Sequence, residues 1–345
     1  MKRKTKTPGV AVTVAVVSAC ALSASPALAS DDAHPLGAYD IIAPPTLKPG
    51  NLGVLSAQNE QKNPYDVINA AAARDPITVT RLRGNINLLQ GSGGNIGVLP
   101  TGDHGAFMVD AGVAVSRQKM EKTLKNLGVS HIGDLVNTHW HFDHTGGNSW
   151  AHEYGARIIA TPNTLRDLSS TIRVEEWSHT FTPIPPSARP TVTVSSEKTF
   201  SAGDQPVQLR PYSPPGHTNG DLSAYFTKTN VLFTGDTYWN GLYPFIDWET
   251  GGSIDGMIQD ANQNIAMVDA NTIVVPGHGP IGKRADLVQY RDMLVSIRNR
   301  VADLKHQGLT VEQIVAAKPT QPFDAKWGQG LIGPDLFTKL VYRGV

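Results

Sequence analysis

The chain has 345 residues, of which 40% are hydrophobic and 17% charged, an ordinary composition for a globular protein with a large core. Its 30 basic and 30 acidic residues balance, which argues against a nucleic-acid-binding protein. A single cysteine, Cys20, excludes a disulfide framework and a cysteine-based zinc cluster. Any metal site must therefore use carboxylates and the 11 histidines.

The first 29 residues have the order of a secretory signal peptide. Residues 2–6 hold four basic side chains, an apolar run follows from Val10 to about Leu22, and Ala27-Leu-Ala29 is an A-x-A cleavage signal. The run is too short for a transmembrane helix, and no later segment is long enough. We therefore expect an exported protein, secreted or periplasmic, with no transmembrane segment. Cleavage after Ala29 would leave 26 basic and 30 acidic residues, a net charge of −4.

A second interpretation of this segment remains open. Residues 17–20, with the sequence VSAC, resemble a bacterial lipobox, in which the cysteine is lipidated and becomes the mature N-terminus. The protein would then be a lipoprotein anchored through Cys20. The sequence does not indicate an oligomeric state.

The rest of the chain is interpreted as an N-terminal arm over residues 30–75 and one domain over residues 76–345. The arm is rich in Ala, Pro, Gly and Asn without strong periodicity, so we expect it to be partly irregular. In the domain, alternating or apolar runs predict strands at 77–82, 86–89, 96–99, 106–109, 157–160, 191–194, 207–210, 222–227, 231–234 and 272–275. Amphipathic spacing and capping residues predict helices at 116–127, 163–170, 253–268, 284–307 and from Thr310 onward. This order fits one domain with two sheets and outer helices, and residues 174–190 are a candidate mobile flap.

Potential metal ligands cluster in residues 137–148, which read NTHWHFDHTGGN. His139 and His141 are two residues apart and point the same way where a strand runs into a loop. Asp143 and His144 lie beyond the turn and can address a second metal. Imidazole nitrogens and carboxylate oxygens are normal zinc ligands.

Three later residues extend this set of candidate ligands. His217 lies in a Pro- and Gly-containing loop, and Asp236 and His278 each come directly after a predicted strand. Loops at strand ends place such side chains at a common rim.

The pattern His139-x-His141-x-Asp143-His144, followed by His217, Asp236 and His278, resembles the metallo-β-lactamase fold superfamily of hydrolases over roughly residues 77–280. Asp110 also matches a structural aspartate of that family. The resemblance implies an α+β fold, an αβ/βα four-layer sandwich of two mixed β-sheets flanked by helices. It also implies two Zn²⁺ ions per chain, one held by His139, His141 and His217 and the other by Asp143, His144 and His278, with Asp236 bridging them.

The resemblance further implies a hydrolase in which a metal-bound hydroxide attacks a small carbonyl substrate, namely an ester, lactone, thioester or amide. Asp143 is expected to orient the hydroxide and to carry a proton to the leaving group. The β-lactamases of the family have Cys, Ser or another residue where Asp236 stands, so the glyoxalase II, lactonase and ribonuclease Z branches are more similar. Hydrolysis of a β-lactam ring remains an alternative. A mono-iron oxidoreductase similar to persulfide dioxygenases, or a non-catalytic binding protein, remains an alternative of another class.

The segment 238–248 follows Asp236 directly and is dense in aromatic residues. It could line an apolar substrate pocket, or it could be a packed loop over the core. Tyr243 or Tyr238 could donate a hydrogen bond to an oxyanion, as a tyrosine does in some lactonases of the family. Tyr243 is therefore a third candidate catalytic residue, beside Asp143 and Asp236.

Overall fold

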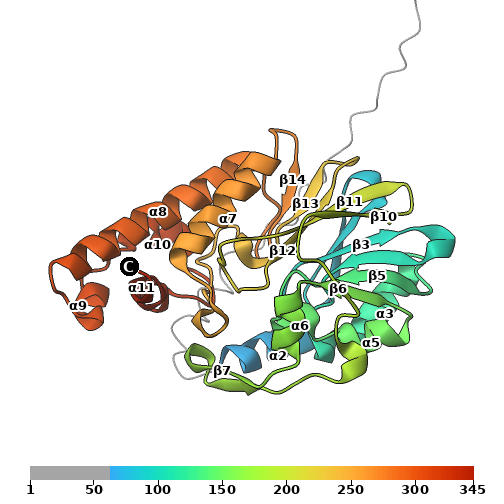
Figure 1. Ribbon diagram of the computed structural model, residues 1–345, viewed down its shortest axis with the longest axis horizontal. Helices are drawn as coiled ribbons and strands as arrows, with labels where there is room; N and C mark the ends of the chain where they lie inside the picture. Colours follow the sequence, from blue (N-terminus) through green and yellow to red (C-terminus); the bar gives the residue numbers. More distant parts are fainter. Residues whose placement is uncertain (1–62) are drawn as a thin grey trace, which may run out of the picture. The chain divides into compact units, whose positions relative to one another are not determined.

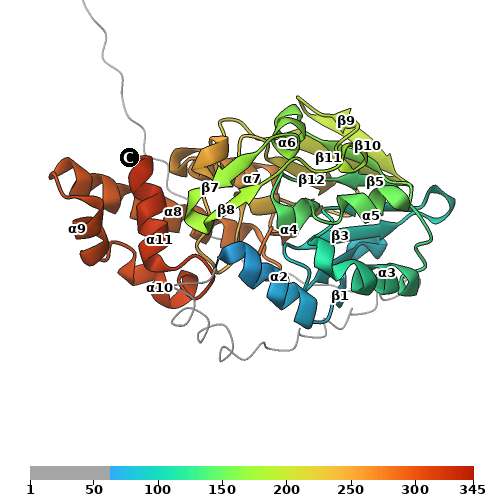
Figure 2. The ribbon, with the colours of Figure 1, turned by 90° about the horizontal axis from the view of Figure 1, so that it is seen from below.

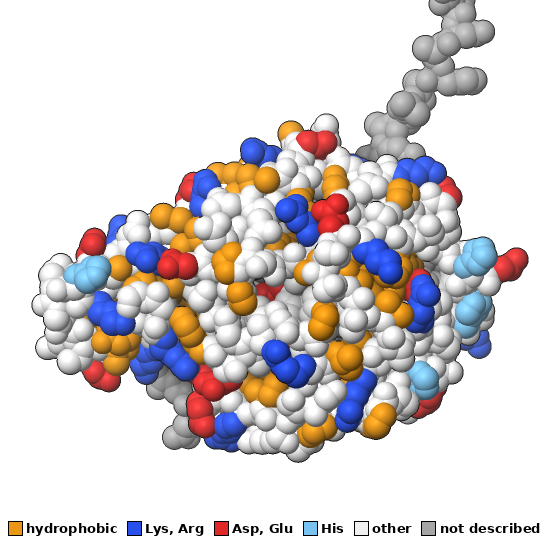
Figure 3. Space-filling model, viewed as in Figure 1, with side chains coloured by type: hydrophobic (Ala, Val, Ile, Leu, Met, Phe, Trp, Pro, Cys, Tyr) orange, Lys and Arg blue, Asp and Glu red, His pale blue; other side chains and the backbone are white. Residues whose placement is uncertain are grey.

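The computed structural model describes residues 63–345 (Figure 1). The expected signal peptide, Cys20 and most of the N-terminal arm lie outside these residues. Within residues 63–345, no helix combines the length and the hydropathy that spanning a bilayer requires. On the face drawn in Figure 3, basic and acidic side chains are interspersed rather than gathered by sign.

Ten α-helices and fourteen strands make up the described fold. The helices are α2 Pro64–Arg74, α3 Arg117–Asn126, α4 Phe142–Thr145, α5 Asn148–Glu153, α6 Pro162–Leu168, α7 Ile254–Met267, α8 Arg284–His306, α9 Val311–Ala316, α10 Gln321–Trp327 and α11 Pro334–Arg343. The first sheet, in spatial order, contains β1 Thr78–Arg81, β2 Asn87–Gln90, β3 Ile96–Pro100, β4 Ala106–Val109, β5 Ile132–Val136, β6 Arg157–Ala160 and β9 Val192–Thr193. The second contains β10 Lys198–Ala202, β11 Gln205–Pro211, β12 Leu222–Phe226, β13 Val231–Phe233 and β14 Ile273–Val275, and β7 Ile172–Val174 pairs with β8 His179–Phe181 in a separate ribbon.

Both large sheets are mixed. In the first, β1 to β4 pair antiparallel and β4, β5, β6 and β9 pair parallel. In the second, β10 to β13 pair antiparallel and β13 pairs parallel with β14. The carboxyl ends of β5, β13 and β14 and the start of β12 consequently face one edge of the molecule, where the loops that carry the candidate ligands emerge.

Three apolar clusters separate four layers, which confirms the predicted αβ/βα sandwich. Between the sheets, side chains such as Phe107 of β4 and Phe226 of β12 meet edge to face with ring centroids 5.8 Å apart. Met120 and Leu124 of α3 pack on the outer face of the first sheet. Helices α7 and α8 cover the outer face of the second sheet (Figure 1).

The predicted strands and long helices are found close to their expected positions, but strands β5 and β10, the β7–β8 ribbon and some helices were not predicted. The end of the arm is not irregular, because residues 64–74 form α2, an alanine-rich helix capped by the Asn63 side chain and begun by a proline. Helices α10 and α11 were also missed. Within the expected flap, β7 and β8 flank a short 3-10 helix, and Trp177 of that helix is buried.

Candidate metal centre

The loop after β5 carries four of the seven candidate ligands. His139 and His141 lie in the loop, and Asp143 and His144 lie in α4, which begins one residue after His141. All four side chains are buried. The ends of the segment are held together by Asn137 and Asn148, whose side-chain amides bond each other at 3.0 and 2.9 Å. This pairing fixes the turn that brings the four ligands to one side.

The other three candidates come from the second sheet. His217 precedes β12, Asp236 lies in a 3-10 helix directly after β13, and His278 follows β14. A close approach of backbone and carboxylate requires a glycine next to His278, because a Cβ atom on Gly277 would lie 1.8 Å from Oδ1 of Asp236. The packing of these two loops therefore fixes the position of the Asp236 carboxylate.

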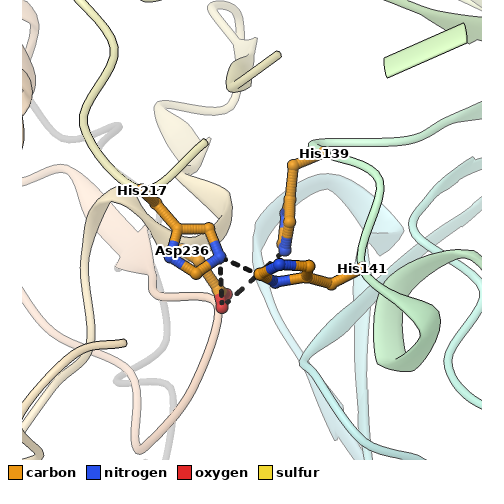
Figure 4. A group of neighbouring side chains, drawn as sticks. All are labelled: His139, His141, His217 and Asp236. Atoms are coloured by element: carbon orange, nitrogen blue, oxygen red, sulfur yellow. Dashed lines mark hydrogen bonds and ion pairs between the residues drawn. The ribbon is translucent and has the colours of Figure 1, made fainter. Parts of the chain in front are cut away.

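The structure brings all seven residues together in two groups. One ligand atom from each of His139, His141, His217 and Asp236 lies within 4.8 Å of the others, and the same holds for Asp143, His144 and His278. Figure 4 shows the first group, with two histidines approaching from the β5 loop and His217 and Asp236 from the opposite side.

Asp236 lies between the two groups of candidate ligands. Its Oδ2 atom is 3.8 Å from Nε2 of His139, 3.4 Å from Nε2 of His217 and 3.4 Å from Nε2 of His278. Its Oδ1 atom is 3.2 Å from Nε2 of His144. One carboxylate thus faces imidazoles of both groups, which is the arrangement that a bridging ligand needs.

Two buried aspartates orient two of the imidazoles. Oδ2 of Asp247 lies 3.0 Å from Nε2 of His141, and Oδ2 of Asp110 lies 2.8 Å from Nδ1 of His144. Each contact occupies the ring nitrogen that points away from the centre and leaves the other nitrogen facing inward. Such outer carboxylates fix the tautomer and direction of metal-binding histidines.

Neutral groups orient the other two histidines of the first group. Nδ1 of His217 donates to the backbone carbonyl of Phe245 at 2.9 Å, and Nδ1 of His139 lies 3.0 Å from Oγ1 of Thr138. Nε2 of His139 is buried and has no hydrogen-bond partner within residues 63–345. A buried ring nitrogen without a partner is costly unless a ligand fills that position.

Asp110 occupies a strained backbone conformation. Its φ of 61° lies in the left-handed region, which is unusual for a residue with a side chain. The carboxylate accepts from the backbone N–H and the hydroxyl of Thr138, both at 2.8 Å, besides its contact with His144. These bonds hold the strained residue where the β5 loop needs it.

The electrostatics of the first group favour neutral imidazoles. Burial lowers the pKa of His139 well below its ordinary value, with the charge of His144 adding to the effect. Burial also lowers the pKa of His217, to about 4. For Asp236, burial alone would raise the pKa, but the surrounding histidines, His278 first, lower it well below the ordinary value. Neutral imidazoles and an ionised carboxylate are the forms that bind a metal.

The donor set fits a divalent metal with nitrogen and oxygen ligands. Five imidazoles and two carboxylates converge, six of these seven residues are fully buried or nearly so, and His278 is partly exposed. Oδ1 of Asp236 is buried and, although it lies 3.2 Å from Nε2 of His144, makes no contact of hydrogen-bond geometry among the described residues; Nε2 of His139 is in the same position. Zinc is held by these ligand types.

Tyr243 is the one predicted site residue that the structure places elsewhere. Its hydroxyl donates to Oδ1 of Asp324 at 2.8 Å and lies 3.2 Å from the carbonyl oxygen of Thr320, and its ring stacks on Phe337. It does not line the cavity beside the ligands. The structure therefore gives no geometric support to Tyr243 as an oxyanion donor, because the chain turns this side chain toward the C-terminal helices.

The aromatic segment 238–248 has both of the roles considered for it. Trp239 and Phe245 line a cavity of about 260 Å³ that opens on the candidate ligands. Tyr238 and Tyr243 are fully buried in the core beneath it. The alternation of lining and core residues could not be read from composition.

Sequence reasoning missed Asp247 and Asp221. Asp221 accepts from the backbone N–H groups of His217 and Thr218, at 2.9 and 2.8 Å, and so shapes the His217 loop. Neither aspartate belongs to a spaced motif. Asp247 had one available signal, its place in the aromatic segment that follows Asp236.

The metal-binding segment lies within a known family pattern. The pattern of the Metallo-beta-lactamase superfamily matches residues 89–278, more than half of the chain. Among curated relatives, the acyl-coenzyme A thioesterase MBLAC2 of Gallus gallus is 26% identical over 156 residues, covering 41% of this chain and 55% of that protein. MBLAC2 of Homo sapiens is 24% identical over 57% of this chain and 73% of that protein. A hydroxyacylglutathione hydrolase of Polaromonas sp. is 26% identical over 48% and 56%.

Two solved structures share the fold. The sec-alkylsulfatase Pisa1 of Pseudomonas sp. superposes with a TM-score of 0.58 at 15% identity, covering 85% of this chain and 54% of that one. The B3 metallo-beta-lactamase BLEG-1 superposes with a TM-score of 0.50 at 21% identity, covering 63% and 99%. The matches thus span only about half of several of these proteins. The relatives are named as hydrolases or thioesterases, in agreement with the predicted metallo-hydrolase class. The family and the fold that the ligand pattern led us to expect are confirmed, and the chain belongs to the metallo-beta-lactamase superfamily.

Proposed function

We propose that this protein is an exported, zinc-dependent hydrolase of small carbonyl compounds: esters, lactones, thioesters or amides. The observation that carries the proposal is the pair of ligand groups that meet at Asp236 and open on a cavity. The thioesterase and hydrolase names of relatives that match about half of the chain support carbonyl chemistry.

The two groups of residues would hold two metal ions. His139, His141 and His217 would hold one, Asp143, His144 and His278 the other, and Asp236 would face both. When bound, a pair of divalent cations supplies an activated water near neutral pH and a Lewis acid for the substrate carbonyl.

Asp143 is the residue best placed to handle protons. It lines the cavity, and its Oδ2 atom lies 3.3 Å from Nε2 of His278. Burial alone would raise the pKa of Asp143, but the charge of His144 and the contact with His278 lower it, so the group is a carboxylate at neutral pH. It would orient the attacking water and deliver a proton to the leaving group.

The export part of the proposal depends on the first 29 residues of the chain. Their basic start, apolar run and A-x-A signal support cleavage after Ala29. The intact mass of the protein recovered from the producing cells distinguishes this from lipidation at Cys20, which would add the mass of the acyl chains.

The activity test uses the purified zinc-loaded protein against a panel of an ester, a lactone, a thioester and a chromogenic cephalosporin, each with a chelator control. We expect chelator-sensitive hydrolysis of at least one carbonyl compound and loss of most activity or of metal in Asp236→Ala. Turnover of the cephalosporin above the other compounds would make the enzyme a β-lactamase. Isolation with one iron and oxygen consumption would replace the proposal, and full activity of Asp236→Ala with two metals retained would remove the bridging role.

A further inference from the structure

The cavity wall away from the ligands is almost entirely apolar. Ile68 and Ala71 of α2 line it on one side, and Trp177, Trp239, Leu242 and Ile332 complete it. Among the lining residues, all of which fall within 63–345, none is Lys or Arg. Asp75, Asp143 and Asp236 are acidic, and the lining histidines, His141, His217 and His278, belong to the candidate ligands. A volume of about 260 Å³ is below the roughly 300–1,000 Å³ of pockets for drug-sized ligands.

We propose that this site selects neutral substrates with a short apolar acyl chain, that the chain lies against α2, and that Ala71 limits its length. The inference rests on the proposed function, since it assigns a substrate class to the same site. On the wall away from the ligands, a chain end bearing a carboxylate would lose its water without a Lys or Arg side chain to pair with. An aliphatic end would instead gain from leaving water.

Helix α2 is held firmly enough to act as a wall. Tyr65, in its first turn, stacks on His179 with centroids 4.0 Å apart and contacts the Phe142 ring at 4.5 Å. At the other end, Nζ of Lys119 donates to the carbonyl oxygens of Ala72 and Asp75. Figure 2 shows α2 beside the β7–β8 ribbon. A wall anchored at both ends can exclude a longer chain rather than yield to it.

Neighbouring alanines on α2 provide a matched pair of variants. Ala71 lines the cavity, whereas Ala70 is exposed. Ala71→Phe adds a ring on the cavity side, and Ala70→Phe adds the same ring on the solvent side. Both substitutions change helix propensity equally, so a difference between them reports the cavity.

The first experiment measures kcat/KM for 4-nitrophenyl acetate, butyrate, pentanoate and decanoate, and for the glutaryl half-ester as the anionic partner of pentanoate. We expect a rise of about fourfold per methylene up to a short limit, because burying one methylene contributes about 0.8 kcal/mol. The kcat/KM for decanoate should be lower than that for butyrate, and the kcat/KM for the half-ester should be at least about 100-fold lower than that for pentanoate. Ala71→Phe should lower the ratio of kcat/KM for butyrate to kcat/KM for acetate by about tenfold, and Ala70→Phe should leave that ratio unchanged.

A binding measurement tests the wall without catalysis. Calorimetry with acetohydroxamate, butyrohydroxamate and the hydroxamate of glutaric acid reports affinity for the zinc-loaded protein, whatever the reaction is. The preference for butyrohydroxamate should disappear in Ala71→Phe and persist in Ala70→Phe. Leu242→Arg, which puts a cation into the wall, should raise the affinity of the glutaric compound at least tenfold.

The outcomes separate the two proposals. Graded hydroxamate binding with no hydrolysis of any carbonyl compound would refute the proposed function and support the wall. Hydrolysis with equal rates for neutral and anionic chains, or equal effects of the two alanine variants, would overturn this inference and leave the proposed function standing.

Discussion

Asp247 provides the sharpest test of how the centre is positioned. The prediction is that Asp247→Asn weakens zinc binding about 10- to 100-fold, because Oδ2 of Asp247 lies 3.0 Å from Nε2 of His141. This loss is equivalent to about 1.4–2.7 kcal/mol of binding free energy. Burial alone would raise the pKa of Asp247, but the contact with His141 lowers it, so the wild-type group is a carboxylate. The substitution removes this charge while keeping the shape.

The structure also predicts a cost in folding stability. Oδ2 of Asp247 accepts from Nε1 of Trp140 at 3.1 Å and from the Thr250 hydroxyl at 2.6 Å, besides facing His141. Oδ1 accepts from the backbone N–H groups of Glu249 and Thr250 at 3.1 and 3.3 Å. In Asp247→Asn, the amide oxygen would face the three side-chain donors, from Trp140, Thr250 and His141. The amide NH₂ group would then face the backbone N–H groups of Glu249 and Thr250, which would have no acceptor. At about 1–3 kcal/mol for each buried donor, the variant should lose about 2–4 kcal/mol, since one donor is partly exposed.

Two measurements separate these effects. Competition with a chromophoric chelator gives zinc affinity, and urea unfolding of the metal-free protein gives the change in stability. Asp167→Asn is the matched control, because Asp167 is also buried but makes its hydrogen bond to Arg166. Zinc affinity of Asp247→Asn within twofold of wild type, or an equal loss in the control, would refute the positioning role.

Three further predictions concern metal, pH and a tyrosine. Removing the metals should lower the midpoint of thermal unfolding by roughly 10 °C in calorimetry, because a ligand at 1,000 times its Kd contributes about 4 kcal/mol to the free energy of unfolding. An unchanged midpoint would contradict a bound metal pair. Burial, with the charge of Asp221 adding, raises the pKa of Asp260 well above its ordinary value, so the contribution of Asp260 to stability should fall as pH rises from about 4 toward that pKa. Asp260→Asn should remove this loss and gain up to about 1.4 kcal/mol per pH unit over wild type in urea titrations. A gain that does not change with pH would contradict this cause. Tyr243→Phe should keep kcat/KM within twofold of wild type. It should lose about 1 kcal/mol of stability, because the hydroxyl that the variant lacks donates a hydrogen bond to Asp324. A large loss of rate at unchanged stability would support a catalytic role for Tyr243.

The candidate ligands could be predicted because chemistry restricts both their types and their spacing. His139, His141, Asp143 and His144 fall within six residues, and Asp236 and His278 follow apolar strands whose carboxyl ends lie at one edge of the fold. The apolar pattern of a buried strand can be recognised in a single sequence, so the carboxyl ends of the strands before Asp236 and His278 were predicted accurately. The grouping of the ligands around Asp236 then follows from the sandwich.

Other residues could not be predicted because their roles depend on where side chains point. Tyr243 lies close to Asp236 in sequence, yet the backbone directs its ring to Phe337 of α11. Asp247 is a single aspartate among aromatic residues until the fold brings His141 to it. Helix α2 was not predicted, because Pro, Gly and Asn residues surround it in the sequence. Its contacts with Phe142 and Lys119 place it at the wall of the cavity.

The placement of ligands across the two sheets has a mechanical consequence. In the first group, His139 and His141 belong to the loop after β5 of the first sheet, and His217 and Asp236 belong to the second. The second group is divided in the same way, since only His278 comes from the second sheet. The spacing between the sheets therefore sets the spacing between ligands. Because the cluster between the sheets is close-packed and resists deformation, it fixes the ligand separation that a metal would meet, and a bound metal would in turn resist separation of the sheets.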